Sequence, residues 1–337
     1  MRQVQLQKPG IENLVLAEVE QPEPGPGEVL VKVHAASINY RDFLIAMGFY
    51  GGPGLTLPLV PLSDGAGEVV ETGSGVTQVQ AGDRVTSLFW QDWQDGVATP
   101  TNRSISTGCE APGMLTEYAV MPESAVARIP DSLSYDEAAT LPCAGLTAWS
   151  SLTTHARVKA GETVLLMGTG GVSLFGLQFA KALGATTIIT SSSDEKLERA
   201  RELGADHVIN YKETPEWGAK AFELASGGVD VVIEIGGAGT LQQSLAAVGL
   251  SGRIAYVGTL TGMNTDLNLL ELLGKNLQIH GLTVGNHADH EKMVGFIDEH
   301  GLSPVIDARS ELEQGAETIA KIAAGQHFGK LVVTLAE

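Results

Sequence analysis

From about Asp136 onward, short apolar runs alternate with stretches that have helical spacing. The runs are TVLLMG, TTIIT, HVIN, VDVVIEIG, RIAYVG and LQIHGLTV, and DEKLERARELG is typical of the segments between them. Apolar runs that alternate with helices are typical of a parallel sheet covered by helices on both faces. We therefore predict an α/β fold with a doubly wound parallel sheet for this part of the chain.

The first 125 or so residues have a different pattern. They are rich in Gly, Pro and short β-like runs, such as EVLVKVHAASI and GEVVETGSGVTQVQAGDRV, which predict an antiparallel, barrel-like domain. The final run, KLVVTL, is followed by no helix, so we expect the tail to return to this first domain. The expected domains are residues 1–125 with 305–337, and residues 126–304.

Composition narrows the possible partners. The 337 residues include 21 Lys and Arg against 40 Asp and Glu, a formal net charge of −19, which repels nucleic acid and anionic lipid. With only Cys109 and Cys143 and no leader-like opening, we expect a cytoplasmic protein without disulfides. The long uncharged window 163–180 is interrupted by glycines, so it is expected to be a strand and a buried helix rather than a membrane span.

The stretch GTGGVSLFG, residues 168–176, resembles a dinucleotide-binding loop that lacks one glycine. Gly168 and Gly170 occupy the first two positions of G-x-G-x-x-G, where a tight turn and close approach to a pyrophosphate are needed, but Ser173 occupies the third. The third glycine mainly permits close packing of helix against strand, which Ser173 and Gly176 could provide together. Because a strand precedes the loop and a helix follows it, we predict a dinucleotide site. The alternative is a strand-to-helix turn that binds no ligand.

Several segments together resemble the medium-chain dehydrogenase/reductase superfamily, over almost the whole chain. They are INYRD, PLSDGAGEVVETGSGVTQVQAGDRV, AATLPCAGLTAW, GTGGVSLFGLQFAKALGA, KLERARELGADHVINY and HFGKLVV. The resemblance is to a zinc-free branch near the quinone oxidoreductases, whose members are also labelled zinc-type alcohol dehydrogenases. It implies a GroES-like β-barrel domain, a Rossmann domain inserted into it, and an active site in the cleft.

The zinc positions of the alcohol dehydrogenases are altered in this chain. Those enzymes carry a Cys where this sequence has Asn39 and a His-Glu pair where it has Ser63 and Asp64, so only Cys143 falls on a ligand position. Catalytic zinc needs three protein ligands. The structural zinc loop of those enzymes has four cysteines, and this chain offers Cys109 alone. We therefore expect no metal.

A second possible metal site lies near the C-terminal end of the chain. His287 and His290 could share one helical face, with Asp289 between them, but no third ligand is evident. We expect these three to be solvated helix residues.

Without zinc, hydrogen bonds must activate the electrophile, which suits an enone or a quinone. The resemblance implies that Asn39, Asp42 and Tyr50 line the substrate site, with Tyr40 as an alternative proton donor. Each has a structural alternative: Asn39 could cap a turn, Asp42 could be a first-turn acid and Tyr50 a loop aromatic. Phe89, Trp90 and Trp93, in the run FWQDWQ, could wall an apolar slot or form local core.

The cofactor candidates come from the glycine loop, the strand that follows it and the resemblance. They are Thr147, Gly168, Gly170, Gly171, Val172, Ser191, Ser192, Lys196, Tyr211 and Gly258. Sites specific for NAD place an acid at the tip of the second strand, but here that strand ends in serines. Tyr211 matches a tyrosine that binds the 2′-phosphate with a lysine in NADPH-dependent relatives, and Lys196 is within reach. We therefore expect NADPH, with NADH as the less favoured cofactor.

The leading functional prediction is a zinc-independent NAD(P)H oxidoreductase that transfers hydride to a quinone or an α,β-unsaturated carbonyl compound. The alternatives are an alcohol dehydrogenase without catalytic zinc and a non-catalytic protein that binds NADPH. We also expect a homodimer, because the last strand, near LQIHGLTV, would otherwise leave an apolar sheet edge exposed. Relatives join their sheets at this edge.

Overall fold

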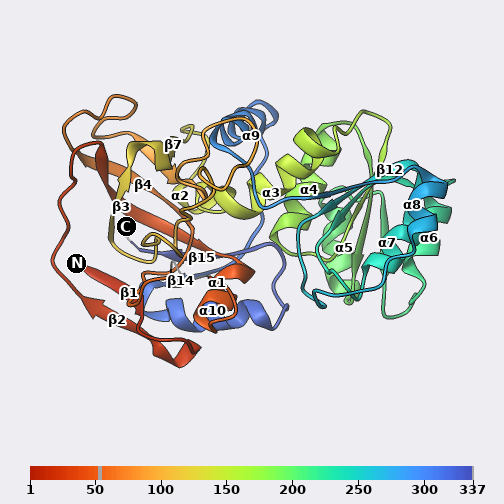
Figure 1. Ribbon diagram of the computed structural model, residues 1–337, viewed down its shortest axis with the longest axis horizontal. Coiled ribbons are helices and arrows are strands. Elements are labelled where there is room, and N and C mark those ends of the chain that lie inside the picture. The colour runs from red at the N-terminus through yellow and green to blue at the C-terminus, as the bar shows by residue number, and fades with distance from the viewer. Residues whose placement is uncertain (52–54, 336–337) are drawn as a thin grey trace. The chain divides into compact units, whose positions relative to one another are not determined.

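The computed structural model describes residues 1–51 and 55–335, which divide into two compact units (Figure 1). The first unit comprises residues 1–146 and 285–337, and the second comprises residues 147–284. The boundaries between the units therefore lie at 146/147 and 284/285, whereas the sequence predicted domain boundaries at 125/126 and 304/305. The reason is that β7 (Val126–Arg128) pairs with β5 (Arg84–Ser87) in the first unit, and α9 (His287–His300) packs against β7.

The second unit is built on a six-stranded sheet in which every pairing is parallel. Its strands are β8 (Thr163–Leu166), β9 (Thr186–Ser191), β10 (His207–Asn210), β11 (Val229–Glu234), β12 (Val248–Tyr256) and β13 (Gln278–Gly281). Their order, β10-β9-β8-β11-β12-β13, reverses direction between β8 and β11, as in a dinucleotide-binding Rossmann sheet. The six apolar runs predicted as strands are therefore confirmed.

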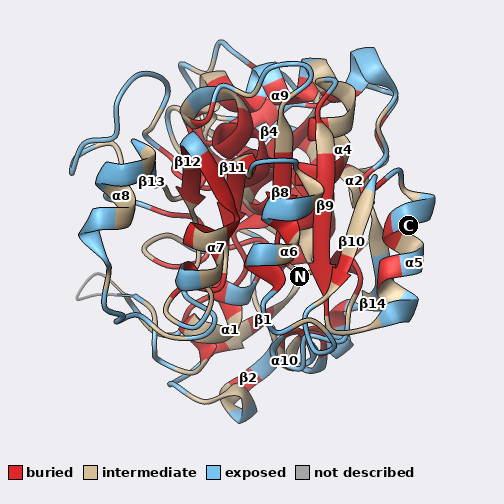
Figure 2. Cartoon of the chain, turned by 90° about the vertical axis from the view of Figure 1, so that its right-hand side faces the viewer, coloured by how far each residue is buried: buried red, intermediate tan, exposed pale blue. Residues whose placement is uncertain are grey.

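Helices connect these strands and cover the sheet. They are α3 (Leu146–Trp149), α4 (Gly171–Ala182), α5 (Asp194–Glu202), α6 (Trp217–Leu224), α7 (Leu241–Ala247) and α8 (Leu269–Lys275). Strands β8, β9 and β11 are almost wholly buried (Figure 2), because helices remove both of their faces from water. Over residues 1–51 and 55–335, no helix is both long and apolar enough to cross a membrane.

The turn from β8 into α4 explains how the missing glycine is tolerated. A Cβ at Gly176 would lie 2.8 Å from Leu166 Cδ2 and 3.2 Å from Ile233 Cδ1, so Gly176 permits the close packing of α4 on the sheet. Ser173 is buried, and its hydroxyl donates a hydrogen bond to the carbonyl of Met167. The packing role of the third glycine is therefore met one turn later in the helix, while a small polar residue satisfies the turn.

The first unit contains a seven-stranded sheet and a two-stranded hairpin. The hairpin is β1 (Arg2–Leu6) and β2 (Leu14–Glu18), and the larger sheet contains β3 (Glu28–Ile38), β4 (Asp64–Thr72), β5, β6 (Tyr118–Pro122), β7, β14 (Ile306–Glu311) and β15 (Lys330–Thr334). Its helices are α1 (Tyr40–Ala46), α2 (Tyr135–Ala138), α9 and α10 (Gly315–Ala323). The predicted GroES-like β domain is confirmed, with few helices in its N-terminal part.

The end of the chain completes this sheet. Strand β15 pairs antiparallel with β3, with Leu331 opposite Ile38, and parallel with β14 on its other side. The expectation that the tail returns to the first domain is therefore correct. The pairing places the start of β15 next to the end of β3, so residues almost 300 positions apart in sequence become neighbours.

The packing role of Gly176 can be measured by comparing Gly176→Ala with Gly295→Ala. Both glycines are helical, so the gain in helix propensity cancels, but a Cβ at Gly295 meets nothing within 4 Å. We expect Gly176→Ala to have the lower free energy of unfolding, by roughly 1–3 kcal/mol, because the added methyl overpacks the contact with Leu166. Urea denaturation of both variants measures the difference, and equal stabilities would contradict this account of the loop.

Candidate functional site

Asn39 lies at the junction between β3, which ends at Ile38, and α1, which begins at Tyr40. Its backbone is extended, as at a helix N-cap, and its N–H donates to Asp42 Oδ2 at 2.8 Å. Both side chains are buried, and Asp42 Oδ1 and Asn39 Nδ2 make no hydrogen bond. Asn39 therefore occupies the N-cap of α1, and Asp42 is an acid in its first turn, as the structural alternatives proposed. In addition, Asn39 Nδ2 and Asp42 Oδ1 have no hydrogen-bond partner of ordinary geometry. A buried polar atom without a protein partner leaves room for a further partner, such as water or a ligand.

Four further residues of the first unit join these two in a group that we call the Asn39 cluster, which is buried except at the partly exposed Cys143. It consists of Asn39, Asp42, Ser63, Asp64, Cys143 and Lys330. Lys330 Nζ donates to Asn39 Oδ1 at 2.5 Å and to the carbonyl of Ile38 at 2.7 Å. Asp64 accepts hydrogen bonds from Ser63 Oγ at 2.6 Å and from the N–H of Cys143 at 3.2 Å. A π-helical turn, η3 (Leu141–Gly145), carries Cys143.

The electrostatics of the Asn39 cluster are dominated by burial. Desolvation raises the pKa of Asp42 from 3.8 to about 6, and nearby Asp64 raises it further while Arg41 and Lys330 oppose the shift. Burial likewise raises the pKa of Asp64, against the charge of Lys330 and the hydrogen bond from Ser63. A hydrogen bond from the Asn39 side chain also lowers that pKa, so Nδ2 faces the Asp64 carboxylate, although the contact falls outside ordinary hydrogen-bond geometry.

Cys143 is the one cluster member that keeps the residue type expected at a zinc-ligand position of the alcohol dehydrogenases. Burial and the charge of Asp64 raise the pKa of its thiol, which favours the protonated form rather than a metal-binding thiolate. Over residues 1–51 and 55–335, no group of three or more His, Cys, Asp or Glu side chains is placed to hold a metal ion. Both oxygens of Asp64 already accept hydrogen bonds, and the Lys330 cation occupies the cluster. These residues do not fit a three-ligand catalytic zinc site.

Tyr50 lies beside a second buried cation. The guanidinium carbon of Arg41 is 5.4 Å from the centroid of the Tyr50 ring and 4.3 Å from that of Phe89. Arg41 also donates to the carbonyl of Thr107 and to Ser106 Oγ, each at 3.0 Å. Burial raises the pKa of the Tyr50 phenol, and the charge of Arg41 opposes that shift.

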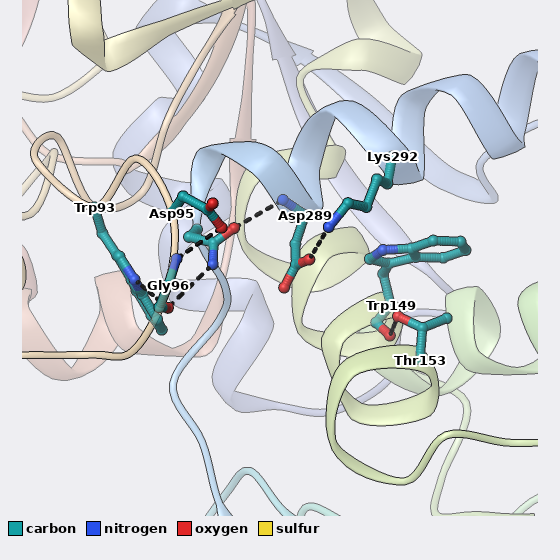
Figure 3. A network of polar contacts seen from close by, with 8 residues as sticks. Trp93, Asp95, Gly96, Trp149, Thr153, Asp289 and Lys292 are labelled. Atoms are coloured by element: carbon teal, nitrogen blue, oxygen red, sulfur yellow. Dashed lines mark hydrogen bonds and ion pairs between the residues drawn. The ribbon is translucent and has the colours of Figure 1, made fainter.

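Tyr40 differs from Tyr50 in exposure. It is 36% exposed, and its ring lies 6.0 Å from that of Phe43 on the same helix. Phe89 and Trp90 are buried and contact each other edge to face, which supports the interpretation of these two as local core. Trp93 instead donates from its indole nitrogen to the carbonyl of Gly96 (Figure 3).

The prediction of solvated residues at 287–290 is wrong for two of the three. Asp289 is buried and His290 is completely buried, which lowers the pKa of its imidazole to about 3. The reason is that the N-terminus of α9 docks on the loop after β5. The N–H groups of His287 and Ala288 donate to the carbonyls of Trp93 and Gln94, each at 3.0 Å.

The cofactor candidates lie in the second unit, at the carboxyl ends of its strands. Gly168, in the left-handed region with φ 68°, follows β8, and α4 begins at Gly171 after the N-cap Gly170. No side chain caps α4, so the N–H groups of its first turn are available to a pyrophosphate. Val172 is the second residue of this helix. The loop therefore fits the diphosphate of a dinucleotide.

The serine corner, by which we mean Ser191, Ser192, Lys196 and Tyr211, forms the neighbouring strand tip. The N–H of Tyr211 donates to the carbonyl of Ser191 at 3.0 Å, so the ends of β9 and β10 lie side by side. Ser193 caps α5, and Lys196 is the third residue of that helix. The carboxylate of Asp194 accepts from Asn210 Nδ2 at 2.7 Å. Asp194, the acid that follows the end of β9 most closely in sequence, is therefore already hydrogen-bonded to the Asn210 side chain.

Gly258 and Thr147 have clear structural reasons for their positions. A Cβ at Gly258 would lie 2.5 Å from the carbonyl oxygen of Ile235, so only glycine fits against the end of β11. Thr147 is buried in α3, and its carbonyl accepts from Ser151 Oγ at 2.7 Å.

Sequence reasoning missed three buried charged residues, Lys330, Arg41 and Glu234. Glu234 accepts from the N–H groups of Gly236 and Gly237 and from Thr240 Oγ1, and so shapes the loop after β11. Lys330 stands in HFGKLVV and Arg41 in INYRD, two of the segments that carried the family resemblance. Lys330 stands at the very start of the predicted apolar strand KLVVTL, and this position was the sequence feature that could have indicated a buried lysine.

Together, a GroES-like β domain and a Rossmann unit with an open glycine loop define the two-domain fold class of the alcohol dehydrogenases and their relatives. A family model for the alcohol dehydrogenase GroES-like domain matches residues 25–131, and one for the zinc-binding dehydrogenases matches residues 171–299. The chain belongs to the medium-chain dehydrogenase/reductase superfamily.

Full-length relatives carry several names. A zinc-type alcohol dehydrogenase-like protein of Schizosaccharomyces pombe is 42% identical, over 97% of this chain and 96% of its own. A quinone oxidoreductase of Pseudomonas aeruginosa is 32% identical, over 96% of each chain. Among solved structures, an NAD-dependent alcohol dehydrogenase superposes with a TM-score of 0.91 at 33% identity, over 99% of each chain. A mycobacterial protein in complex with NADPH gives 0.84 at 26% identity, over 99% of each chain. Relatives thus use both nicotinamide cofactors.

The raised pKa of Asp42 predicts a loss of stability with increasing pH. Because the folded pKa, about 6, exceeds the unfolded value of 3.8, folding is favoured below the unfolded value and loses that advantage as the pH rises through 6. Relative to Asp42→Asn, the wild type should therefore lose roughly 3 kcal/mol of unfolding free energy between about pH 4 and about pH 8. Urea denaturation across this range measures the difference. Asp131→Asn, at an exposed position, is the control, and a parallel pH profile for wild type and Asp42→Asn would refute the assignment.

Proposed function

We propose that this protein is a zinc-independent reductase that uses NADPH to reduce a quinone or a carbon–carbon double bond conjugated to a carbonyl group. When bound, NADPH supplies the hydride, and its nicotinamide is oxidised as the double bond is reduced. In the enone case, the hydride adds to the β-carbon, negative charge builds on the carbonyl oxygen, and a proton completes the saturated product. The work of the protein is then to stabilise that oxygen and to deliver the proton.

The observation that carries this proposal is the unused Nδ2 donor of Asn39. It is buried and faces Asp64 without a hydrogen bond of ordinary geometry, and it belongs to a residue that stands where the alcohol dehydrogenases carry a zinc ligand. A fixed donor aimed at an oxygen that gains charge is the means by which enzymes without a Lewis acid stabilise such a transition state. The name of the quinone oxidoreductase relative supports the same class of substrate.

Tyr50 is the proton donor that we favour over Tyr40. Burial raises the pKa of its phenol, so the hydroxyl keeps its proton at neutral pH, and the nearby Arg41 cation favours the phenolate that forms when the proton leaves. Tyr40 lies partly in solvent and has no comparable cation among its described ring contacts.

Purified protein should reduce quinones or enones in a chelator and contain less than one zinc per chain. A panel of quinones, enones and alcohols, with NADPH, NADH and their oxidised forms, is followed by the nicotinamide absorbance while elemental analysis counts the metal. Asn39→Ala should lower kcat by about 10²- to 10³-fold, because one oxyanion donor is lost. Asn268→Ala removes another N-cap asparagine, at α8, and should leave kcat unchanged. Zinc-dependent oxidation of alcohols alone would support the alcohol dehydrogenase alternative.

We infer a preference for NADPH from the serine corner. A strand tip without a carboxylate does not repel a 2′-phosphate, and the nearest acid, Asp194, is bonded to Asn210. Tyr211 follows the end of β10 beside the end of β9, and Lys196 lies in the first turn of α5, the helix that follows β9; an ammonium and a phenol suit a phosphate. The NADPH complex of a mycobacterial relative supports this choice, whereas the NAD-dependent relative shows that the superfamily uses either cofactor.

Lys196→Ala should raise KM for NADPH by about tenfold or more, because a charge-assisted contact to the 2′-phosphate is worth on the order of 1.5–3 kcal/mol. KM for NADH should barely change, since NADH lacks that phosphate. Lys220→Ala removes an exposed lysine of α6 and is the matched control. Steady-state kinetics with both cofactors decide the point. An equal effect on NADPH and NADH, or a wild-type preference for NADH, would reject the inference.

We also propose a homodimer formed at the β13 edge of the second unit. Strand β13 pairs only with β12 among the described strands, and Ile279 on it is 37% exposed. The helix before it, α8, exposes Leu269, Leu270 and Leu273 to 63%, 74% and 72%. An apolar sheet edge beside apolar helix residues favours pairing with a second copy.

Light scattering at micromolar concentration should give the mass of a dimer. Changing Leu270 and Leu273 to Glu should shift the protein toward monomer, because charges would replace the exposed leucines. Val97→Glu, at a residue of the first unit that is 82% exposed, should leave the mass unchanged. A monomeric wild type would refute the dimer.

A further inference from the structure

Lys330 is a buried cation whose backbone is held firmly in place. It is 3% exposed, it begins β15, and its N–H donates to the carbonyl of Val305 at 2.8 Å. The preceding Gly329 has φ 92°, and a Cβ there would lie 2.3 Å from that same carbonyl oxygen, so only glycine allows this approach. From this anchor the side chain reaches the end of β3, where Nζ donates to Ile38 and Asn39.

The contact with Lys330 decides which way the Asn39 amide faces. An ammonium group can only donate, so the atom of Asn39 that lies 2.5 Å from Nζ must be the oxygen, and Nδ2 must lie on the other side. Asn39 therefore cannot flip without placing two donors against each other. The unused Nδ2 donor keeps one orientation, and the hydrogen bond from a cation to Oδ1 polarises the amide and makes Nδ2–H a stronger donor.

Charge gives Lys330 a second effect on the same site. Asp42 and Asp64 are both buried in the Asn39 cluster, and the charge of Lys330 acts on each. Without Lys330, only Arg41 would offset the charge of the two buried carboxylates, which would oppose the build-up of negative charge on a substrate oxygen. With it, the surroundings of the Nδ2 donor are more nearly neutral.

We propose that Lys330 is a positioning residue that orients and polarises the Asn39 amide, so that Nδ2 donates to the substrate oxygen that gains negative charge. In this role the lysine supplies, through an amide, the positive charge that zinc supplies directly in the metal-dependent relatives. The proposal rests on the proposed function, because it assigns Asn39 the same oxygen. It predicts that most of the effect of Lys330 on catalysis depends on the presence of Asn39.

A double-mutant cycle tests this coupling. Lys330→Met should lower kcat for the best enone or quinone by about tenfold or more, with KM for NADPH unchanged. In an Asn39→Ala background, the same substitution should change kcat by less than about threefold, because the donor that it positions is already absent. Lys321→Met, at a lysine of α10 paired with Glu317 on the surface, is the control. Effects that multiply in the double variant would overturn the proposal, since they would mean that Lys330 acts independently of Asn39.

Lys330→Arg keeps the experiment decisive if Lys330→Met does not fold. Arginine retains the charge but moves the donors, so kcat should fall, and the loss should again disappear in the Asn39→Ala background. Refolded activity and the urea midpoint show whether each variant is native. A fall in kcat of the same size in both backgrounds would overturn the proposal.

A readout without turnover separates this proposal from the proposed function. The oxyanion of 4-nitrophenol mimics the charged oxygen, and its absorbance reports its ionisation when it is bound to the protein with NADP⁺. The wild type should lower the pKa of the bound phenol, Lys330→Met and Asn39→Ala should each weaken that effect, and the double variant should weaken it no further. If the wild type reduces neither enones nor quinones, the proposed function fails, while the phenol cycle still decides the role of Lys330. An unperturbed phenol, or no binding, would overturn that role.

Discussion

The antiparallel pairing of β15 with β3 is the constraint on which the candidate site depends. It places the last strand of the described chain beside the strand that leads into Asn39. Lys330 and Asn39, almost 300 positions apart in sequence, therefore come into contact. Neither residue is unusual by itself. Their contact converts an N-cap amide into a fixed donor and puts a cation where two carboxylates are buried.

At the positions that match zinc ligands of the alcohol dehydrogenases, this chain has a set of mutually hydrogen-bonded polar residues rather than an apolar core. Asp64 is held by Ser63 and by the backbone of Cys143, and the Asn39 amide is held by Lys330. Burying charges is costly unless they are paired and hydrogen-bonded. A cluster with two carboxylates and one ammonium, in which two polar atoms still lack partners, is therefore poorly explained by stability alone. The unused atoms suggest a substrate as the missing partner.

The second unit shows that a dinucleotide-binding loop can lack one glycine of the motif and still keep the packing that this glycine provides. The third glycine of the dinucleotide loop permits a helix to approach a strand, and Gly176 performs that role three residues after Ser173, against Leu166 and Ile233. Ser173 adds a hydrogen bond to Met167 that glycine could not make. Glu234 orders a neighbouring loop through backbone donors. No side chain caps α4, so the backbone N–H groups of its first turn are open to an anion.

The sequence by itself determined the six parallel strands, the β-rich N-terminal domain, the return of the tail and the glycine loop, because local periodicity and turn residues specify these features. Tertiary structure alone decided the burial of His290, the unit boundaries and the partnership of Lys330 with Asn39. Those properties depend on contacts between segments far apart in the chain: α9 with the loop at Trp93 and Gln94, β7 with β5, and β15 with β3. A pattern of hydrophobic and polar positions records which face of an element is buried, but it does not record which distant side chain will meet that face.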